Sequence, residues 1–213
     1  MTDLPSETQV VVIGGGVVGA SVLYHLTKAG WTDVVLLERT ELTAGSTWHS
    51  AGGMHTLNGD PNVAKLQQYT IELYKEIEEV SGQDCGITIT GGIMLADNEQ
   101  RMDWLRSAHA RGRYLGMETE LLSVAEAKKL LPIFDEQYFV GAMYDAHEGH
   151  VDPSGVTHAF AKAARDNGAQ IHRDTWVRAL DRDSSGKWRV HTIRTSTGED
   201  LGSISCQHVV NAG

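Results

Sequence analysis

The sequence is poor in cysteine, has no long apolar run and carries no excess of basic residues. Its two cysteines, Cys85 and Cys206, lie far apart without a CxxC neighbour, which argues against a disulfide framework and against a cysteine zinc site. No apolar stretch approaches the roughly 20 residues that are needed to span a bilayer. Lys and Arg number 18 against 28 Asp and Glu, for a net charge of −10. Phosphate backbones repel such a chain, so nucleic-acid binding is not expected.

Residues 1–9 lack the basic region of an export signal and the Arg-rich amphipathic pattern of an organelle address. We therefore expect a cytoplasmic protein, with the mitochondrial matrix as the alternative if the chain is a processed form. Hydrophobic residues make up 41% of the chain and charged residues 22%, which is typical of a folded globular protein rather than of a disordered one.

The N-terminal part of the chain predicts a strand, a helix and a second strand. Residues 9–13 form a short apolar, β-branched run that indicates a buried parallel strand. Residues 17–29 carry apolar side chains at helical spacing, and Gly30 ends the helix. Residues 33–37 predict a second buried strand, which ends at Glu38. In this order the three elements predict a right-handed βαβ unit.

The middle of the chain predicts a long loop and then a lobe of mixed structure. Residues 43–59 are rich in Gly, Ser, Thr and His and show no period, which is typical of a loop with its own chemistry. The next segment, residues 61–80, predicts an amphipathic helix with an apolar stripe of Val63, Leu66, Leu73, Ile77 and Val80. After it we expect a strand over 87–95, helices over 100–115 and 124–130, and a strand over 138–144.

The sequence of the C-terminal part predicts a helix and further strands that rejoin the first sheet. Asp152 and Pro153 provide the N-cap and the first position of another helix, which ends at Asn167. A strand over 169–172 leads into an antiparallel meander with strands over 176–181, 187–194 and 201–205. A last apolar strand over 207–210 ends the chain without a following helix. We therefore expect a truncated domain whose isolated form is incomplete, poorly soluble and inactive.

A glycine pattern of the form GxGxxG lies between the first strand and the first helix. Gly14 permits a tight turn, Gly16 lets a pyrophosphate approach the backbone, and Gly19 lets the helix lie close to the sheet. The helix N-terminus offers free N–H groups and a positive dipole end, and Glu38 can accept both ribose hydroxyls of an adenosine. In this context the pattern predicts dinucleotide binding. The acidic residue at position 38 argues against the 2′-phosphate of NADP.

The loop that follows Glu38 and Arg39 favours FAD over NAD. Backbone N–H groups freed by its glycines, together with the hydroxyls of Ser46 and Thr47, suit a second contact with a pyrophosphate. The meander points the same way, by analogy with flavoproteins of the two-dinucleotide type. We therefore expect an α/β fold with two interleaved lobes. A Rossmann-type FAD-binding lobe with a three-stranded β-meander takes residues 1–57 and 150–213, and part of an α+β substrate lobe takes residues 58–149.

Residues 41–52, with the sequence ELTAGSTWHSAG, closely resemble a stretch of the dimethylglycine and sarcosine dehydrogenases, in the D-amino-acid-oxidase-like flavoprotein superfamily. Residues 149–153, the alanine-rich helix after them, and residues 207–211 resemble the same family, so the resemblance spans essentially the whole chain. Members of that family often have one more residue where residues 211–213 stand. The resemblance implies oxidative N-demethylation of an N-methylated glycine such as dimethylglycine or sarcosine, by hydride transfer to flavin N5.

The same resemblance implies a role for His49. In the family, the histidine at this position carries the flavin covalently through its 8α-methyl group, and a neutral imidazole is a competent nucleophile. The alternative is a loop histidine that only packs or forms a hydrogen bond. The resemblance also implies that backbone groups at Val177 contact the adenine. The candidate cofactor-binding residues are Gly14, Gly16, Val17, Val18, Gly19, Glu38, Arg39, Gly45, Ser46, Thr47, His49, Ala51, Gly52, Gly53 and Val177.

Other groups are weaker candidates. His147, His150 and Asp152 could be drawn as a metal site, but they lack a helical presentation and a further ligand, so we expect no metal and assign them to ordering the next helix. The resemblance allows an electron-transfer protein as partner, and folate only through a region outside this chain. Two other functions stay open, a flavin-binding fragment without turnover and an amine oxidase that uses oxygen.

Overall fold

The computed structural model describes residues 4–56 and 60–213, and they form two compact units. The first unit consists of the described residues up to Ala51, of Glu76–Cys85 and of Asp152–Gly213. The second unit consists of the described residues of Gly52–Lys75 and of Gly86–Val151. Helices combined with parallel and antiparallel strands confirm the expected α/β class. The expected boundary between residues 57 and 58 lies outside the described residues.

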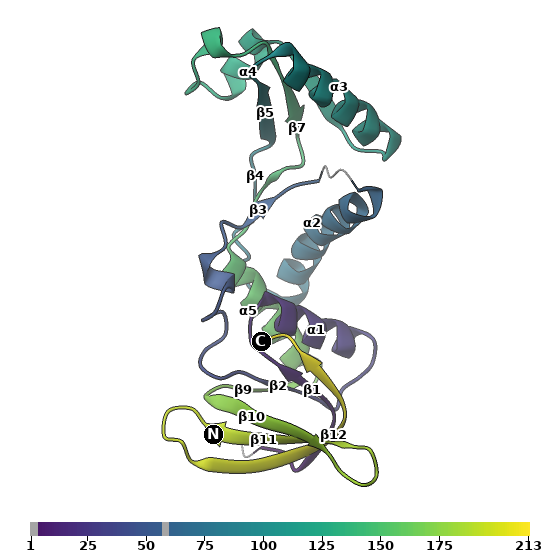
Figure 1. Cartoon of the computed structure of the whole chain (residues 1–213), viewed down its shortest axis with the longest axis vertical. Coiled ribbons are helices and arrows are strands. Elements are labelled where there is room, and N and C mark those ends of the chain that lie inside the picture. The colour runs from purple at the N-terminus through teal and green to yellow at the C-terminus, as the bar shows by residue number, and fades with distance from the viewer. Residues whose placement is uncertain (1–3, 57–59) are drawn as a thin grey trace. The chain divides into compact units, whose positions relative to one another are not determined.

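The first unit is built on a six-stranded sheet in the order β10–β11–β12–β1–β2–β9 (Figure 1). The β1, β2, β9 and β12 strands pair in parallel, and β10, β11 and β12 form the antiparallel meander. The inner strands β1 and β2 are apolar and largely buried, as the β-branched runs predict. The strands span Glu7–Ile13 (β1), Val34–Leu37 (β2), Gln170–His172 (β9), Thr175–Arg182 (β10), Trp188–Arg194 (β11) and Asp200–Asn211 (β12).

A single strand, β12, replaces the two strands that were expected over 201–205 and 207–210, so this prediction was wrong. Its first half pairs antiparallel with β11, and its second half pairs parallel with β1. Ser205 and Cys206 take part in both ladders, opposite Glu7 and Thr8 of β1. Because no turn-forming residue separates the two halves, the chain stays extended and joins the meander to the parallel strands.

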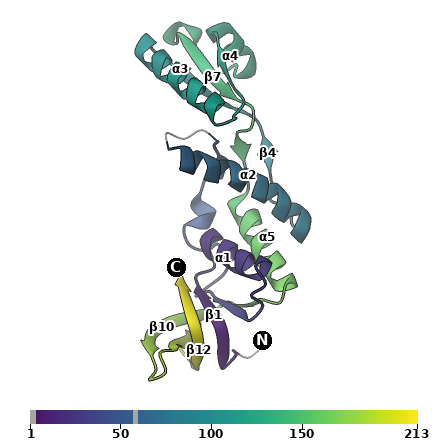
Figure 2. The same ribbon diagram turned by 90° about the vertical axis from the view of Figure 1, so that its right-hand side faces the viewer.

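Two helices of the first unit, α1 (Val17–Lys28) and α5 (Pro153–Asp166), pack against each other on one face of this sheet (Figures 1 and 2). Leu23 and Phe160 are fully buried between the layers. The alanine residues of α5 are also buried, and their small side chains let the helices approach closely. Asp152 caps α5 by accepting from the Ser154 N–H at 2.9 Å, as expected.

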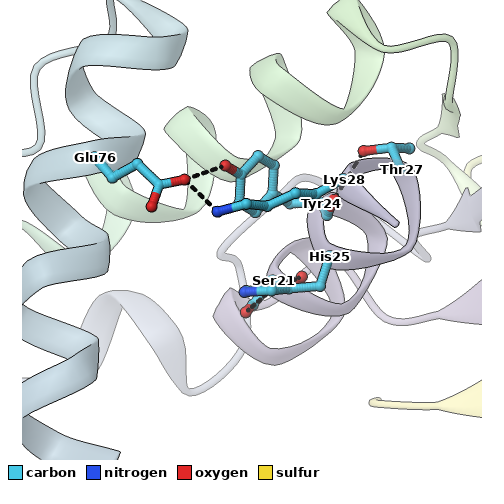
Figure 3. Close-up of polar contacts among 6 residues, drawn as sticks. All are labelled: Ser21, Tyr24, His25, Thr27, Lys28 and Glu76. Carbon is cyan, nitrogen blue, oxygen red and sulfur yellow. Dashed lines mark hydrogen bonds and ion pairs between the residues drawn. The ribbon is translucent and has the colours of Figure 1, made fainter. Parts of the chain in front are cut away.

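The end of α2 (Pro61–Ser81) is tied to α1 by a polar cluster (Figure 3). The Tyr24 hydroxyl donates to Glu76 Oε1 at 3.0 Å, and Lys28 Nζ forms an ion pair with the same oxygen. Both contacts hold the pKa of Glu76 below its usual value, led by the hydrogen bond from Lys28. Burial raises the pKa of Tyr24, so this phenol stays a donor at neutral pH. The cluster therefore fixes one helix against another at the surface of the first unit.

We expect Tyr24→Phe to lower the free energy of unfolding by about 1 kcal/mol, since one hydrogen bond to a partly exposed carboxylate is lost. The loss should be full above the unfolded-state pKa of Glu76. It should fade as the pH falls through the lowered folded-state pKa, because the carboxylate is then protonated in both states. Urea denaturation at neutral and acidic pH measures both effects. With Glu76→Gln as background, Tyr24→Phe should cost less, and an equal cost in both backgrounds would contradict the coupling.

The second unit contains two small sheets of three strands each. In the larger sheet, β7 lies between β5 and β6, and α3 and α4 pack against these strands. The smaller sheet places β8 between β3 and β4. The strands are β3 (Gly53–Met54), β4 (Thr88–Ile89), β5 (Gly92–Ala96), β6 (Thr119–Leu122), β7 (Gly141–Asp145) and β8 (Gly149–His150), and the helices are α3 (Glu99–Tyr114) and α4 (Val124–Leu130).

Two expectations for the middle of the chain need correction. The strand expected over 87–95 is split, because Gly91 has φ +71° and sends β4 and β5 into different sheets. A Cβ at Gly91 would lie 2.3 Å from the Tyr144 hydroxyl, so only glycine fits this turn. The apolar stripe of α2 is also wrong in part. Leu73 and Ile77 are buried, with Ala64 and Ile71 beside them, whereas the other three predicted positions, Val63, Leu66 and Val80, are exposed.

Candidate dinucleotide-binding site

The glycine turn between β1 and α1 is so tight that side chains do not fit. Gly14 has φ +105°, and a Cβ there would lie 2.6 Å from the backbone oxygen of Ala212. A Cβ at Gly19 would lie 1.9 Å from the backbone oxygen of Gly14. The two glycines thus let α1 begin directly against the sheet, where its first N–H groups and its positive dipole end can meet an anion.

Glu38, at the end of β2, is held by the backbone on both carboxylate oxygens. Oε2 accepts from the Gly15 N–H at 2.7 Å, and Oε1 accepts from the Thr40 N–H at 2.7 Å. Oε1 also accepts from the Thr40 hydroxyl at 3.2 Å, so Oε2 is the oxygen that keeps a further lone pair for a hydroxyl group of a ligand. This geometry fits the ribose contact that the sequence predicts.

The loop after Glu38 docks onto the glycine turn. Thr43, a non-glycine residue with φ +71°, donates its N–H to the Gly15 carbonyl at 3.0 Å. The hydroxyl of Thr47 accepts from the Val17 N–H, the first of α1, at 3.0 Å. Since the hydroxyl oxygen accepts here, its proton stays available for a phosphate oxygen. A short 3₁₀ turn (η1, Thr47–His49) follows this contact.

These elements surround a cavity of about 1030 Å³ within the first unit. Ten of the predicted cofactor residues line it, which brings the glycine turn, Glu38, the loop and the meander together: Gly14, Gly16, Val17, Val18, Glu38, Arg39, Gly45, Ser46, Thr47 and Val177. The lining does not include Gly19, His49, Ala51, Gly52 or Gly53. Gly19 is buried on the sheet side of α1, and Gly52 and Gly53 belong to the second unit.

His49 lies at the end of the 3₁₀ turn with an exposed side chain. Its Nδ1 is 3.0 Å from the Gly45 carbonyl oxygen. A carbonyl oxygen only accepts, so Nδ1 carries the proton and Nε2 is the nitrogen with the free lone pair. The ring also packs against the Trp48 indole, with centroids 4.0 Å apart and an interplanar angle of 38°. Backbone and indole therefore fix both the tautomer and the ring orientation of His49.

The sequence prediction missed several lining residues that come from the meander and from the chain end, among them Trp176, Arg178 and Asn211. Arg178 Cζ lies 4.8 Å from the centroid of a Trp176 ring, and Arg39 Cζ lies 6.0 Å from it. β10 begins three residues after β9, which pairs with β2, and the Thr175 N–H donates to the Glu38 carbonyl at 2.9 Å, so the start of β10 lies beside the site. Asn211 reaches the cavity through the pairing of β12 with β1.

The described residues show neither a metal cluster nor a reactive thiol. Within residues 4–56 and 60–213, no group of three or more His, Cys, Asp or Glu side chains is placed to hold a metal ion. Cys85 and Cys206 are buried free thiols. Burial, and then the carboxylate of Glu78, raise the pKa of Cys85 to about 12, and burial also raises the pKa of Cys206. Both thiols stay neutral and unreactive at neutral pH.

The cavity, the glycine turn and Glu38 together fit a dinucleotide. The N–H groups of the first turn of α1 after that of Val17, and the Ser46 and Thr47 hydroxyls, suit a pyrophosphate, and Glu38 suits the ribose of the adenosine. Comparison with known proteins decides which dinucleotide family this is. Residues 9–213 match the DAO family, described as FAD dependent oxidoreductase. The chain belongs to this family.

The relatives of this FAD-dependent oxidoreductase domain are longer proteins. It is 36% identical over 211 residues to human dimethylglycine dehydrogenase, mitochondrial, covering 99% of this chain and 24% of the relative. It is 38% identical over 211 residues to human sarcosine dehydrogenase, mitochondrial, covering 98% of this chain and 22% of that relative. The chain thus spans about a quarter of the length of these relatives. The crystal structure of L-proline dehydrogenase from P. horikoshii aligns with a TM-score of 0.87 and 27% identity, over 98% of this chain and 53% of that one.

Two further features concern the same domain. In the part of the chain that the structure describes, no helix is long and apolar enough to cross a membrane.

In the second unit, the buried carboxyl of Glu148 has a pKa raised by burial and partly lowered again by a hydrogen bond from His55, whose Nδ1 lies 3.2 Å from Oε2. Carboxyl groups in such surroundings are candidates for acid–base chemistry. Sequence reasoning missed this pair because its members lie far apart in the chain.

Proposed function

We propose that the chain is the FAD-binding part of an amine dehydrogenase that oxidises an N-methylated glycine such as dimethylglycine or sarcosine. The observation that carries the proposal is the docking of the 43–47 loop onto the N-terminus of α1, which makes the loop and the glycine turn line one cavity. The substrate class is supported by the two relatives at 36% and 38% identity, whose names state that they act on these amines.

The residues of the chain divide the work of holding FAD. Glu38 contacts the ribose of the adenosine, while the N–H groups of α1 that follow that of Val17, with the hydroxyls of Ser46 and Thr47, bind the pyrophosphate. The bound flavin supplies the redox chemistry, as acceptor of the hydride that leaves the N-methyl carbon. The task of the protein is then to orient the amine and to exclude water.

His49 is proposed as the covalent attachment point of the flavin. The Gly45 carbonyl holds the proton on Nδ1, so Nε2 would be the nitrogen that takes the place of one hydrogen of the 8α-methyl group. That hydrogen would leave as a proton, its electron pair would reduce the flavin, and the electron acceptor of the enzyme would reoxidise it. The indole of Trp48 limits rotation of the imidazole ring. A covalent bond of this kind prevents loss of the cofactor and changes the electronic properties of the flavin.

The test of this function uses the 213-residue chain supplied with FAD. We expect this chain to bind FAD and turn yellow without being reduced by either amine, since it spans about a quarter of the length of its relatives. In a longer protein that contains the chain, dimethylglycine or sarcosine should bleach the flavin absorbance under anaerobic conditions, and an artificial electron acceptor should restore it. Binding of FAD without bleaching in the longer protein as well would favour a flavin-binding fragment without turnover. Hydrogen peroxide release under air would favour an amine oxidase over a dehydrogenase that passes electrons to a carrier protein. Folate, as acceptor of the one-carbon unit, would need a region outside this chain.

We expect Glu38→Gln to raise the dissociation constant of FAD about tenfold to a hundredfold. The amide keeps the shape but presents an NH₂ group to one of the two backbone donors, Gly15 or Thr40, and hydrogen bonds to a charged acceptor are worth about 1.5–3 kcal/mol. Equilibrium titration with FAD measures the change. Glu41→Gln is the matched control, because Glu41 lies outside the cavity and pairs with Arg173. Equal affinities in both variants would show that Glu38 does not hold the ribose.

A further inference from the structure

His55 and Glu148 form a pair of one exposed and one buried side chain in the second unit. His55 directly follows β3, and Glu148 directly precedes β8, the strand that pairs with β3. The His55 side chain is 61% exposed and that of Glu148 8%, and Nδ1 of His55 lies 3.2 Å from Oε2 of Glu148. A carboxylate only accepts, so in the neutral ring Nδ1 carries the proton and Nε2 keeps a free lone pair. A Cβ at Gly53 would lie 3.4 Å from Nε2, so a larger side chain there would cover this nitrogen.

The backbone around Glu148 fits its carboxyl group closely. A Cβ at Gly92 would lie 1.8 Å from Oε2, so the carboxyl group occupies the space that a side chain at position 92 would need. The Thr56 N–H forms a hydrogen bond with the carboxyl group, and the Gly91 N–H donates to the Glu148 carbonyl oxygen at 2.9 Å. These contacts hold Oε2 against His55, while Oε1 has no hydrogen-bond partner among the described residues.

The charges around Glu148 favour the uptake of one proton by the pair. Burial raises the pKa of Glu148, the hydrogen bond from His55 lowers it, and the Asp145 carboxylate raises it again. Asp145 is also buried, and it accepts from the Thr56 hydroxyl and from the backbone N–H of His147. In the described part of the chain, no lysine or arginine forms an ion pair with Glu148 or Asp145. A buried carboxylate without a cation is costly, so a proton taken up at Nε2 of His55 creates the cation that this carboxylate lacks.

The substrates of the proposed function need a group that removes a proton. An N-methylated glycine is an ammonium ion at neutral pH, because alkylammonium groups such as that of lysine lose their proton only at about pH 10. While the proton is bound, the nitrogen has no lone pair with which to form a C=N bond as the hydride leaves the methyl carbon. The proton must therefore be removed before the amine can be oxidised.

We propose that His55, supported by Glu148, is the base that takes the proton of the substrate ammonium group. The inference rests on the proposed function and assigns to it the residue that prepares the amine. The Nε2 lone pair binds the proton, and the electron pair of the broken N–H bond stays on the amine nitrogen. The imidazolium faces the Glu148 carboxylate and passes its proton to water, because its side chain is exposed. His55 comes six residues after His49, so the segment with the proposed flavin attachment leads directly to this base.

The first test follows anaerobic flavin reduction by dimethylglycine, as a function of pH, in a longer flavin-loaded protein that contains this chain. His55→Ala should lower the rate at neutral pH at least about a hundredfold, the loss expected for a general base. The remaining rate should rise about tenfold per pH unit up to about pH 10, since only amine that has lost its proton in solution then reacts. Added imidazole should restore part of the rate. Glu148→Gln should cause a smaller loss in the same direction, because His55 is still present.

A second measurement needs neither flavin nor turnover. Nitrogen NMR of the histidine rings in the 213-residue chain should show His55 with its proton on Nδ1 at alkaline pH. Glu148→Gln should lower the pH at which this ring takes up its second proton, because the imidazolium then loses the carboxylate that it faces, and it should leave the His147 ring unaffected. An unchanged titration of His55 in Glu148→Gln would show that the carboxylate does not support the base.

His147→Ala is the matched control for the kinetic test. His147 is also a partly exposed histidine of the second unit, but its partner Glu118 is 83% exposed, and Nε2 rather than Nδ1 lies near that carboxylate, at 3.5 Å. This variant should keep the parent rate and pH profile. A parent rate in His55→Ala, or a loss that is equal at every pH and that imidazole does not restore, would overturn the inference alone. A longer protein that binds FAD but is reduced by neither amine at any pH would contradict the proposed function itself.

Discussion

Replacing His49 with alanine is expected to abolish covalent flavin attachment while FAD still binds reversibly. The wild-type chain, denatured with acid, should keep its yellow colour in the pellet, and the peptide that contains His49 should gain the mass of FAD. In the variant all flavin should appear in the supernatant. Reversible binding survives because Glu38, Ser46, Thr47 and the N–H groups of α1 do not depend on the imidazole. Mass spectrometry of the intact chain and of its peptides measures the change.

His147→Ala is the control for this experiment. His147 is another partly exposed loop histidine, and its Nε2 lies 3.5 Å from a Glu118 carboxylate oxygen, in the second unit. The flavin of this variant should stay attached. A colourless wild-type pellet would refute the covalent bond but leave FAD binding intact, because that rests on the glycine turn and Glu38. Flavin still attached in His49→Ala would place the bond on another residue.

The βαβ unit could be predicted from the sequence because the signals for it are local. The apolar run of β1, the helical spacing of α1 and the glycines between them lie within one short stretch, and the structure confirms all three elements. The helix α5 could be predicted equally well, since its N-cap Asp152 and its first residue Pro153 favour the first helical turn in which they lie. In both cases the residues that specify the element are also the residues that form it.

Other elements depend on partners far away in the chain. Only pairing with both β11 and β1 shows that β12 is one strand, and only the φ of +71° at Gly91 shows that the expected strand is divided there. The helix α2 carries apolar residues on more than one side, and only some of them are buried. Which side is buried is therefore decided by the elements that pack against the helix. Predicting such features requires knowledge of the tertiary contacts, and the hydrophobic periodicity of the sequence does not provide it.

The candidate site likewise combines residues that local sequence predicts with residues that only the tertiary structure brings to it. Gly14 and Gly16 were predicted from spacing and residues 45–47 from composition, and the structure places them in the cavity wall, whereas Gly19 does not line it. Trp176 and Arg178 come from β10 and flank Val177, which the resemblance marks. Composition and spacing do not mark these two side chains themselves. The role of His49 rests on a resemblance, and the hydrogen bond to Gly45 adds which nitrogen is free to react.

Gly19→Ala is expected to have the largest effect on folding. The added Cβ would lie 1.9 Å from the backbone oxygen of Gly14. Gly14 cannot move aside easily, because its N–H donates to the Leu37 carbonyl at 2.9 Å and its φ is +105°. The helix α1 must therefore shift away from the sheet. Overpacking against a fixed backbone costs about 3 kcal/mol, and the N–H groups that bind the pyrophosphate shift with the helix. Urea denaturation and FAD titration should both register the change.

Two other glycines of the same site provide a graded comparison. A Cβ at Gly45 meets nothing within 4 Å, so Gly45→Ala should stay within about 0.5 kcal/mol of the wild type. At Gly16 a Cβ would lie 3.0 Å from the Thr47 hydroxyl oxygen, which is part of a side chain and can give way. Gly16→Ala should therefore be intermediate in stability, yet it should weaken FAD binding, because it disturbs the contact between Thr47 and Val17. If all three variants were equally stable, close approach of α1 to the sheet would not be the reason for glycine at position 19.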